Sequence, residues 1–379
     1  MSTIKTKCIY CKKIKPTTSF NDEHVIPRFL GRFEPENPKL KRIYGLVCSK
    51  CNSKIFSALE TIFKEDSGEG LLAQQLNLNG SNSVRILGKR LKIESVPGFG
   101  NSFFNGMFPF MKIEEGKIVI DLERPHVKVK NYANGYQVFP IEALEAAKNN
   151  GGSNFKKIKE RLSNVKESDI SVFTVGSSLE NNDLNKILRL LNDFGVKYNE
   201  KERKFEPPDK LQGRQWEIAL QGTVDRDIGR VLAKIMFNYF TYCAQQERRS
   251  SMVYGNEFKK IRDFICGDVS IPLKDVITSI DKDCILDIEN EEKKRLILHS
   301  IVFEIKDEKI VGRLALFGQR VYEIVIGDIP KFLDKNNFGC GHVFDPFEHA
   351  IFNLSQKLKE NLTEEDTRVS FGLNRKVGI

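Results

Sequence analysis

The stretch that decides how this chain begins to fold is Cys8-Ile-Tyr-Cys11, followed by Asp22-Glu-His-Val-Ile-Pro27 and Cys48-Ser-Lys-Cys51-Asn52. Each CxxC pair can turn tightly enough to present two sulfurs to one ion, and two pairs complete a tetrahedral zinc site. The alternative, a redox CxxC, calls for one pair that opens a helix in a βαβ unit. We therefore predict a structural zinc ion bound by Cys8, Cys11, Cys48 and Cys51, which a segment this small needs because it buries little surface alone.

Positive charge is concentrated in the same segment. Residues 1–56 hold 12 Lys and Arg against four Asp and Glu, whereas the whole chain has 60 and 51. A four-thiolate zinc site is formally 2−, and the remaining surplus still suits a polyanion, since Lys and Arg contacts to phosphate dominate nucleic-acid affinity. The alternative is a solvated basic segment. The phosphate contacts that we predict are Arg28, Arg32, Lys50 and Lys54.

Residues 5–65 resemble the HNH endonucleases, specifically the zinc-ribbon type with a ββα-metal core. The resemblance rests on CIYC at 8–11, EHVIP at 23–27 and CSKCN at 48–52. It implies that His24 is the general base and that Glu23 and Asn52 bind the catalytic Mg²⁺ or a similar divalent ion. The residue types suit this chemistry, because imidazole titrates near neutral pH and carboxylate and amide oxygens are hard ligands.

The segment also departs from the family pattern. The place of the middle Asn, which orients the His, is taken by Ile43, and Asn37 in the preceding loop is a substitute. The place of a last His is taken by Phe56. Glu60, one turn further along a predicted helix over 52–63, is an additional candidate ligand. Structural alternatives remain for the trio: a core histidine, a surface carboxylate and, for Asn52, a helix cap.

Adjacent side chains of a regular strand point to opposite faces. Glu23 and His24 can therefore converge on one phosphate only where a strand ends or its backbone is irregular. Pro27 cannot donate to a ladder, so the sequence predicts that the strand ends near this point.

The predicted fold class is α+β: a small N-terminal ββα-metal zinc module, then a large mixed α+β region with antiparallel strands. Glu65–Gly70 is expected to be an acidic, Gly-rich link, and Pro346–Asn361 a last long helix. Apolar residues recur at helical spacing from Ile228 to Cys243, with Asp225 or Thr223 as the cap. Three segments, 297–305, 310–317 and 321–326, predict an antiparallel meander. The expected domains are 1–66, 67–205 and 206–379.

The expected function is that of a metal-dependent endonuclease that hydrolyses phosphodiester bonds, most often in double-stranded DNA for this family. Restriction or anti-phage defence is the expected setting, and cutting both strands with one site would favour a homodimer. No signal peptide or membrane span is evident, so a cytoplasmic location is expected. One alternative is a non-catalytic zinc ribbon that binds nucleic acid. The other is a nuclease switched on by a small nucleotide or regulatory protein sensed in the C-terminal region.

Overall fold

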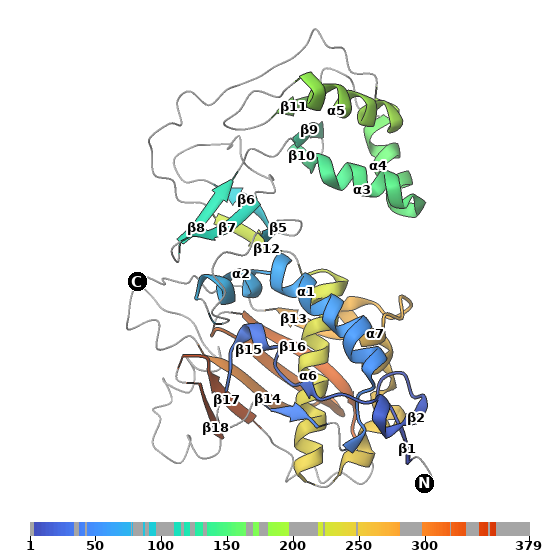
Figure 1. The fold of residues 1–379 in the computed structure, drawn as a ribbon, viewed down its shortest axis with the longest axis vertical. Helices are drawn as coiled ribbons and strands as arrows, with labels where there is room; N and C mark the ends of the chain where they lie inside the picture. The colour runs from blue at the N-terminus through green and yellow to red at the C-terminus, as the bar shows by residue number, and fades with distance from the viewer. Residues whose placement is uncertain are drawn as a thin grey trace. The chain divides into compact units, whose positions relative to one another are not determined.

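The chain divides into two compact units in a computed structural model, Met1–Ser81 with Val224–Ile379, and Asn82–Thr223 (Figure 1). The structure describes residues 4–33, 38–41, 44–76, 78, 86–87, 91–95, 110–114, 117–121, 126–131, 135–163, 170–173, 181–196, 219–222, 224–247, 249–280, 298–318, 320–330, 341–347 and 349–353. The N-terminal segment thus shares a unit with the C-terminal part of the chain. The predicted domain boundaries at 66/67 and 205/206 divide the chain by expected function, and they stay predictions.

The predicted α+β class is confirmed, and a six-stranded antiparallel sheet organises the first unit. The order of its strands is β13 (Ile277–Ile280), β16 (Arg320–Asp328), β15 (Lys309–Leu316), β14 (His299–Lys306), β17 (Gly341–Asp345) and β18 (Ala350–Asn353). The predicted meander is β14-β15-β16. Asp307 and Glu308, both at positive φ, make the two-residue turn between β14 and β15, as the twist of a tight hairpin requires.

Helix α6 (Arg226–Gln246) is the central element of this unit. Asp225 caps it as predicted, accepting hydrogen bonds from the backbone N–H groups of Asp227 and Ile228. Every residue from Val231 to Thr241 is buried, which is the pattern of a helix covered on all sides. On the sheet side the packing is close: a Cβ added at Gly312 of β15 would meet the Met236 methyl at 1.9 Å.

The N-terminal segment is built from short elements. They are β1 (Lys5–Lys7), β2 (Ile14–Pro16), β3 (Glu23–His24), β4 (Lys39–Leu40), a π-helical turn (Cys51–Phe56), α1 (Ser57–Asp66) and α2 (Gly68–Gln75). β1 pairs with β2, and β3 pairs with β4, both antiparallel. The predicted helix over 52–63 is confirmed as the π-helical turn continued by α1.

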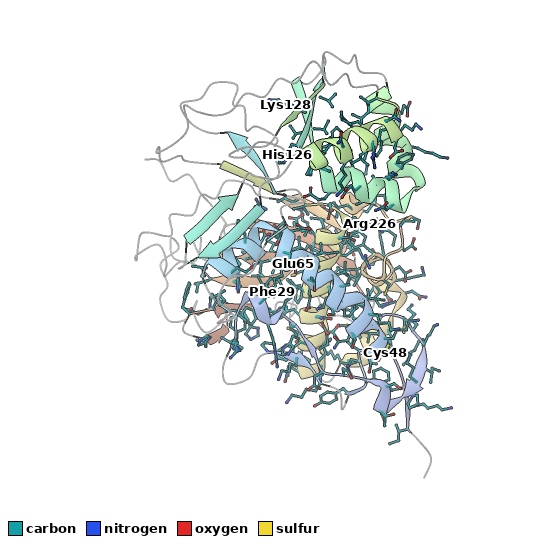
Figure 2. All side chains as sticks on the ribbon, turned by 45° about the horizontal axis from the view of Figure 1, so that its top comes forward. Phe29, Cys48, Glu65, His126, Lys128 and Arg226 are labelled. Carbon is teal, nitrogen blue, oxygen red and sulfur yellow. The ribbon has the colours of Figure 1, made fainter. Side chains whose placement is uncertain are left out.

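The N-terminal segment covers the side of α6 that the sheet leaves open. α1 lies across α6 (Figure 1), and one continuous hydrophobic core includes both, together with the sheet. The Tyr10 ring packs edge-on against Phe56 and Phe237, at centroid distances of 4.6 and 5.8 Å. The ring of Phe29, labelled in Figure 2, packs against the ring of Phe63 in α1, with 5.8 Å between the ring centroids. The small module therefore obtains from α6 the core that its own length cannot supply.

Two secondary-structure predictions were wrong. The expected link Glu65–Gly70 is helical, because Ser67 caps α2 by accepting a hydrogen bond from the Gly70 N–H at 2.9 Å. The expected helix Pro346–Asn361 begins instead as β18, since residues 350–353 pair with the open edge of β17. The remainder of that expected helix lies outside the described residues.

His299 fixes the loop after Pro27 to the sheet. The Phe317 N–H donates to His299 Nδ1 at 3.0 Å, so the ring proton is on Nε2, which donates to the Leu30 carbonyl at 2.8 Å. The ring is fully buried, and burial lowers its pKa to about 4. Both ring nitrogens are satisfied only in the neutral form, which makes this histidine a structural residue.

Within the residues that the structure describes, the second unit holds the small sheets β5-β7-β8, β10-β9-β11 and β12-β6, together with three helices. The strands are β5 (Ile86–Leu87), β6 (Leu91–Ser95), β7 (Phe110–Glu114), β8 (Lys117–Asp121), β9 (His126–Asn131), β10 (Gly135–Pro140), β11 (Ile170–Phe173) and β12 (Ala219–Gly222). The helices are α3 (Ile141–Asn150), α4 (Gly152–Ser163) and α5 (Asn181–Asp193), and they share an apolar core with β9 and β10. Throughout the described ranges, no helix is both long and apolar enough to cross a bilayer.

The first prediction concerns the autonomy of the N-terminal segment. A fragment of residues 1–81 should lack a cooperative thermal transition even with zinc, because Tyr10 and Phe56 lose Phe237 and the buried carboxyl of Glu23 loses its cover. Circular dichroism and amide NMR dispersion measure this, with the full chain as control. A fragment that melts cooperatively with native-like dispersion would contradict the shared core.

The second prediction concerns pH. The pKa of His299 is 6.5 in the unfolded chain and about 4 in the folded one, so the unfolded state binds the extra proton between these values. The stability this residue contributes is complete above pH 6.5 and is lost as pH falls through 4. Unfolding free energy should drop by about 2 kcal/mol from this group between pH 7 and 5. Denaturant titrations of wild type and His299→Gln should show a flatter pH slope in the variant; equal slopes would contradict the assignment.

Candidate active site and zinc cluster

The four predicted cysteines form one cluster. Their Sγ atoms all lie within 4.8 Å of one another, with 3.9 Å between Cys8 and Cys51 and 3.8 Å between Cys11 and Cys48. A disulfide would bring two sulfurs to about 2 Å. Sulfurs at about 2.3 Å from a tetrahedral zinc are about 3.8 Å apart, so this spacing fits the metal. The cluster therefore has the geometry of a four-cysteine zinc site.

The surroundings of the cluster favour thiolates. The Cys48 N–H donates to Cys8 Sγ at 3.5 Å, and Lys15 Nζ lies 3.1 Å from Cys48 Sγ. The hydrogen bond between Cys8 and Cys51 lowers the pKa of the Cys8 thiol to about 5, and the same contact, with burial, raises the pKa of Cys51. Without a cation, one of the two sulfurs must stay protonated, so that it can donate a hydrogen bond to the thiolate beside it. A divalent ion removes this conflict by binding all four as thiolates.

The Glu-His pair lies on a strand only two residues long. β3 pairs with β4 through Glu23 opposite Leu40 and His24 opposite Lys39. Glu23 is 3% exposed, whereas His24 is half-buried, so the two side chains lie in different environments. The strand ends at His24, before Pro27, in agreement with the prediction that it ends near this point.

The carboxylate of Glu23 points to α6. Its Oε1 is 2.5 Å from Lys234 Nζ and accepts a hydrogen bond from Asn238 Nδ2 at 3.2 Å. Burial raises the pKa of Glu23, and the attraction of Lys234 opposes that shift. Burial alone would lower the pKa of Lys234, but Glu23 and Glu60 raise it above the ordinary value. Lys234 is thus a charged partner in a fully buried position.

Glu60 joins the same network from α1. Its Oε1 contacts Lys234 Nζ, and its side chain is 28% exposed, so Glu60 connects the buried pair with the surface. The Lys234 ammonium also lies over the Phe56 ring, 5.2 Å from its centroid. One ammonium thus serves two carboxylates, one buried and one partly exposed.

Asn52 is held beside the Glu-His pair. It lies in the π-helical turn directly after Cys51, and its Nδ2 donates to the Asp22 carbonyl at 2.9 Å. Because an oxygen faces the amide nitrogen, the Oδ1 of Asn52 is the atom left to bind a cation. The cysteine cluster fixes this position, since Asn52 N–H also donates to the Cys48 carbonyl at 3.0 Å.

His24 is neutral at physiological pH. Burial lowers its pKa to about 4, and the positive charges of Arg28 and Lys39 act in the same direction. Its Nδ1 is buried and has no hydrogen-bond partner among the described residues. An orphaned ring nitrogen in a basic, half-buried setting is a group prepared to accept a proton or bind a ligand.

The structure ties Asn52 to Asp22, the residue that precedes Glu23 and His24, and Lys234 links Glu60 to Glu23. The residues present fit a hard divalent cation, because Glu23 retains a second carboxylate oxygen and Asn52 its amide oxygen. Around this region, all four predicted phosphate contacts are exposed, namely Arg28, Arg32, Lys50 and Lys54. Asn37 and Ile43, considered for the middle position of the motif, lie outside the described residues.

Two residues of this region were missed from sequence. Lys234 and Asn238 lie four residues apart on α6, opposite the apolar stripe, where a solvent-facing position would be expected. Their neighbours Ala233, Phe237 and Thr241 carry no charge, and this was the available signal that part of this face is covered. What the sequence did not show was a partner for them more than 200 residues away.

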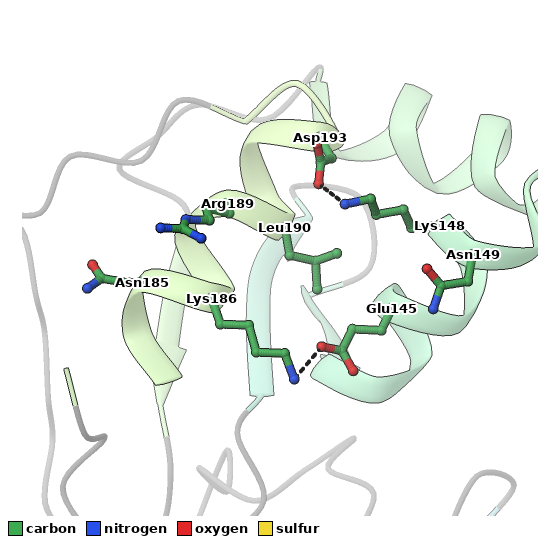
Figure 3. Close-up of a pocket in the computed structure, with 8 residues that line it drawn as sticks. All are labelled: Glu145, Lys148, Asn149, Asn185, Lys186, Arg189, Leu190 and Asp193. Atoms are coloured by element: carbon green, nitrogen blue, oxygen red, sulfur yellow. Dashed lines mark hydrogen bonds and ion pairs between the residues drawn. The ribbon is translucent and has the colours of Figure 1, made fainter. Parts of the chain in front are cut away.

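A separate concavity lies in the second unit, with a volume of about 490 Å³ between α3 and α5. Figure 3 shows its charged walls joined in pairs: Lys148 to Asp193 at 2.5 Å and Lys186 to Glu145 at 2.7 Å. These pairs are partly exposed and offset one another's charge. The cavity contains none of the predicted site residues.

Comparison with known proteins agrees with this site. Residues 8–65 match a family model described as HNH endonuclease, a range that holds all four cysteines, the Glu-His pair, Asn52 and Glu60. The match supports a nuclease of the HNH type, which acts on nucleic acid and uses a divalent metal. No curated protein and no solved structure matches the chain.

The third prediction tests the zinc cluster. Cys11→Ser should reduce bound zinc from one ion per chain to a small fraction, and it should lower the thermal midpoint, because the metal supplies folding free energy. Cys266→Ser is the matched control: Cys266 is near the cluster but outside it, and burial raises its pKa to about 12. Elemental analysis of purified protein measures the metal. Equal zinc in both variants would contradict the four-cysteine site.

Proposed function

We propose that this protein is a metal-dependent endonuclease that hydrolyses phosphodiester bonds in double-stranded DNA. The observation that carries the proposal is the juxtaposition of Glu23, His24 and Asn52 beside a four-cysteine cluster, within the range that matches the HNH endonuclease model. Double-stranded DNA is proposed because the resembled family most often cuts it. The zinc ion and the catalytic ion then have separate duties, one structural and one chemical.

Glu23 and Asn52 are the residues that would hold the catalytic divalent ion, with Mg²⁺ as the proposed species. Both present oxygen atoms, which Mg²⁺ prefers, and the Asn52 position is fixed by its place directly after Cys51. A bound ion would supply Lewis-acid stabilisation of the charge that develops on the phosphate. Glu60 is an additional candidate ligand, through its partly exposed carboxylate.

His24 is the proposed general base. A base must be unprotonated at the start of the reaction, and burial with two neighbouring cations keeps the His24 imidazole neutral. A water molecule that transfers its proton to the ring can then attack the phosphorus atom. The bond from phosphorus to the leaving sugar oxygen breaks, and the departing alkoxide takes a proton from solvent. The charge that His24 gains in this step is the charge its surroundings disfavour, which promotes return of the proton to solvent after the cut.

Basic side chains around His24 would position the backbone of the nucleic acid. Arg28 and Lys39 face the imidazole closely enough to influence its pKa, and Lys50 and Lys54 are exposed on either side of Asn52. Such contacts bind phosphate without reading base sequence. From this surface we therefore expect an affinity for nucleic acid that falls as the salt concentration rises, without preference for a particular target sequence.

The fourth prediction concerns His24. Replacing His24 with Ala should reduce the rate of Mg²⁺-dependent nicking of plasmid DNA by about 100-fold or more, as for loss of a general base, with zinc content and thermal midpoint retained. His349→Ala is the matched control, since His349 lies in an exposed turn, and it should cut at the wild-type rate. Parallel assays on single-stranded DNA and RNA test the substrate class.

Equal nicking by wild type and His24→Ala would overturn the assignment of the base. A wild-type chain that binds DNA without cutting it under any divalent ion would favour a non-catalytic zinc ribbon instead.

A further inference from the structure

The amide side chain of Asn238 connects helix α6 with the N-terminal motif at the candidate site. Asn238 Nδ2 donates to Glu23 Oε1 at 3.2 Å and to the backbone carbonyl of His24 at 3.3 Å. Its Oδ1 accepts a hydrogen bond from the Tyr10 hydroxyl. Asn238 is fully buried in the middle of α6, more than 200 residues from all three partners.

The contacts fix the orientation of the Asn238 amide. An ionised carboxylate and a backbone carbonyl can only accept hydrogen bonds, so the NH₂ group of Asn238 faces Glu23 and His24. The amide oxygen then faces Tyr10, whose hydroxyl donates to it. The two amide protons then have one acceptor each. Three of the four hydrogen bonds that an Asn side chain can make are formed, and rotation of the amide would break all of them.

Lys234 acts on the same carboxylate oxygen from one helical turn earlier. Its Nζ lies 2.5 Å from Glu23 Oε1, and the Phe56 ring lies below the ammonium. The i and i+4 positions of one buried helix therefore both engage Oε1 of Glu23. Both contacts fall on the same carboxylate oxygen, so α6 restrains the orientation of the Glu23 carboxylate through Oε1.

We propose that Asn238, supported by Lys234, is a positioning residue of the nuclease: it holds the Glu23 carboxylate and the His24 backbone in the arrangement that binds the divalent ion. The inference deepens the proposed function and rests on it. The N-terminal motif then supplies the groups that touch metal and substrate, and α6 supplies the groups that orient them. Residues that orient a metal ligand typically change metal affinity by 10–100-fold when replaced.

Tyr10 extends this arrangement to the zinc cluster. It lies between Cys8 and Cys11, so its position is set by the cysteine knuckle, and its hydroxyl sets the Asn238 amide. A continuous path of contacts thus runs from the zinc cluster through Tyr10 and Asn238 to Glu23. Tyr10→Phe removes only the hydroxyl and leaves the ring packed against Phe56 and Phe237.

The test uses the zinc-loaded full chain and measures Mn²⁺ binding by electron paramagnetic resonance titration, which needs no turnover. Asn238→Ala should weaken Mn²⁺ binding by about 10-fold or more, and Tyr10→Phe by about 3-fold, as expected for loss of an orienting group and of one supporting hydrogen bond. For plasmid nicking, kcat should fall in the same order while KM for DNA is unchanged, because the exposed basic residues are not altered.

Thr241→Val is the matched control. Thr241 is equally buried on α6, one turn beyond Asn238, and its hydroxyl donates to the Phe237 carbonyl of its own helix at 2.7 Å. This variant should keep wild-type Mn²⁺ affinity, kcat and KM even if its thermal midpoint falls. If Asn238→Ala does not fold, Tyr10→Phe still provides the comparison, because it leaves the helix intact.

The outcomes separate this inference from the proposed function. If wild type binds Mn²⁺ and cuts DNA, while Asn238→Ala and Tyr10→Phe lose only thermal stability, α6 is merely structural and the inference is overturned. If wild type neither binds Mn²⁺ nor cuts, the proposed function is overturned and the inference with it. Loss of Mn²⁺ affinity in both variants but not in Thr241→Val supports the inference.

Discussion

The contact between Lys234 and Glu23 is the constraint on which the first unit depends. A carboxylate and an ammonium that are both removed from water must meet, since breaking such a pair by removing one partner costs about 3–5 kcal/mol. The placement of the N-terminal segment on α6 satisfies this pair and also lets Asn238 reach the His24 backbone. Apolar packing holds the segment to the helix, and this polar contact specifies its register. We infer that the nuclease motif and the C-terminal sheet fold as one body.

The same constraint explains how one short segment can accommodate two kinds of metal chemistry. Four sulfurs suit zinc, while the carboxylate and amide oxygens suit a harder ion, and these donor sets are adjacent without mixing. Cys51 and Asn52 are neighbours, yet the π-helical turn directs one into the cluster and the other toward Asp22. Single π-helical turns within helices often occur at functional sites, because the additional residue changes the direction of a side chain.

Much of this architecture could be predicted from sequence, because the signals are local. The spacing of the cysteines specifies their cluster, and the apolar stripe with Asp225 before it specifies α6. The alternation from Ile297 to Ile326 specifies the meander. The errors arose where tertiary contacts decided the outcome. Residues 350–353 became a strand because β17 had an edge to pair, and Glu65–Gly70 became helical because Ser67 could cap the next helix.

The candidate site divides along the same line. Glu23, His24 and Asn52 could be predicted because a motif fixes their order and spacing. Lys234 and Asn238 could not be predicted in the same way. Two polar residues one turn apart on a helix are expected to face solvent, and only the tertiary structure shows that the N-terminal segment buries them. The role of a middle Asn in orienting the His was sought nearby, at Asn37. In the described structure, the amide of Asn238 on α6 donates to the backbone carbonyl of His24. The two residues are more than 200 positions apart in sequence, which no short motif can span.

The most direct test of this account is a crystal structure of the zinc-loaded full chain soaked in Mn²⁺, with anomalous maps for both metals. The account predicts zinc at the four cysteines and a single Mn²⁺ bound by Glu23 and Asn52, with Lys234 and Asn238 still on the other oxygen of the Glu23 carboxylate. Manganese bound elsewhere, or Lys234 expelled from Glu23 when the ion enters, would contradict it.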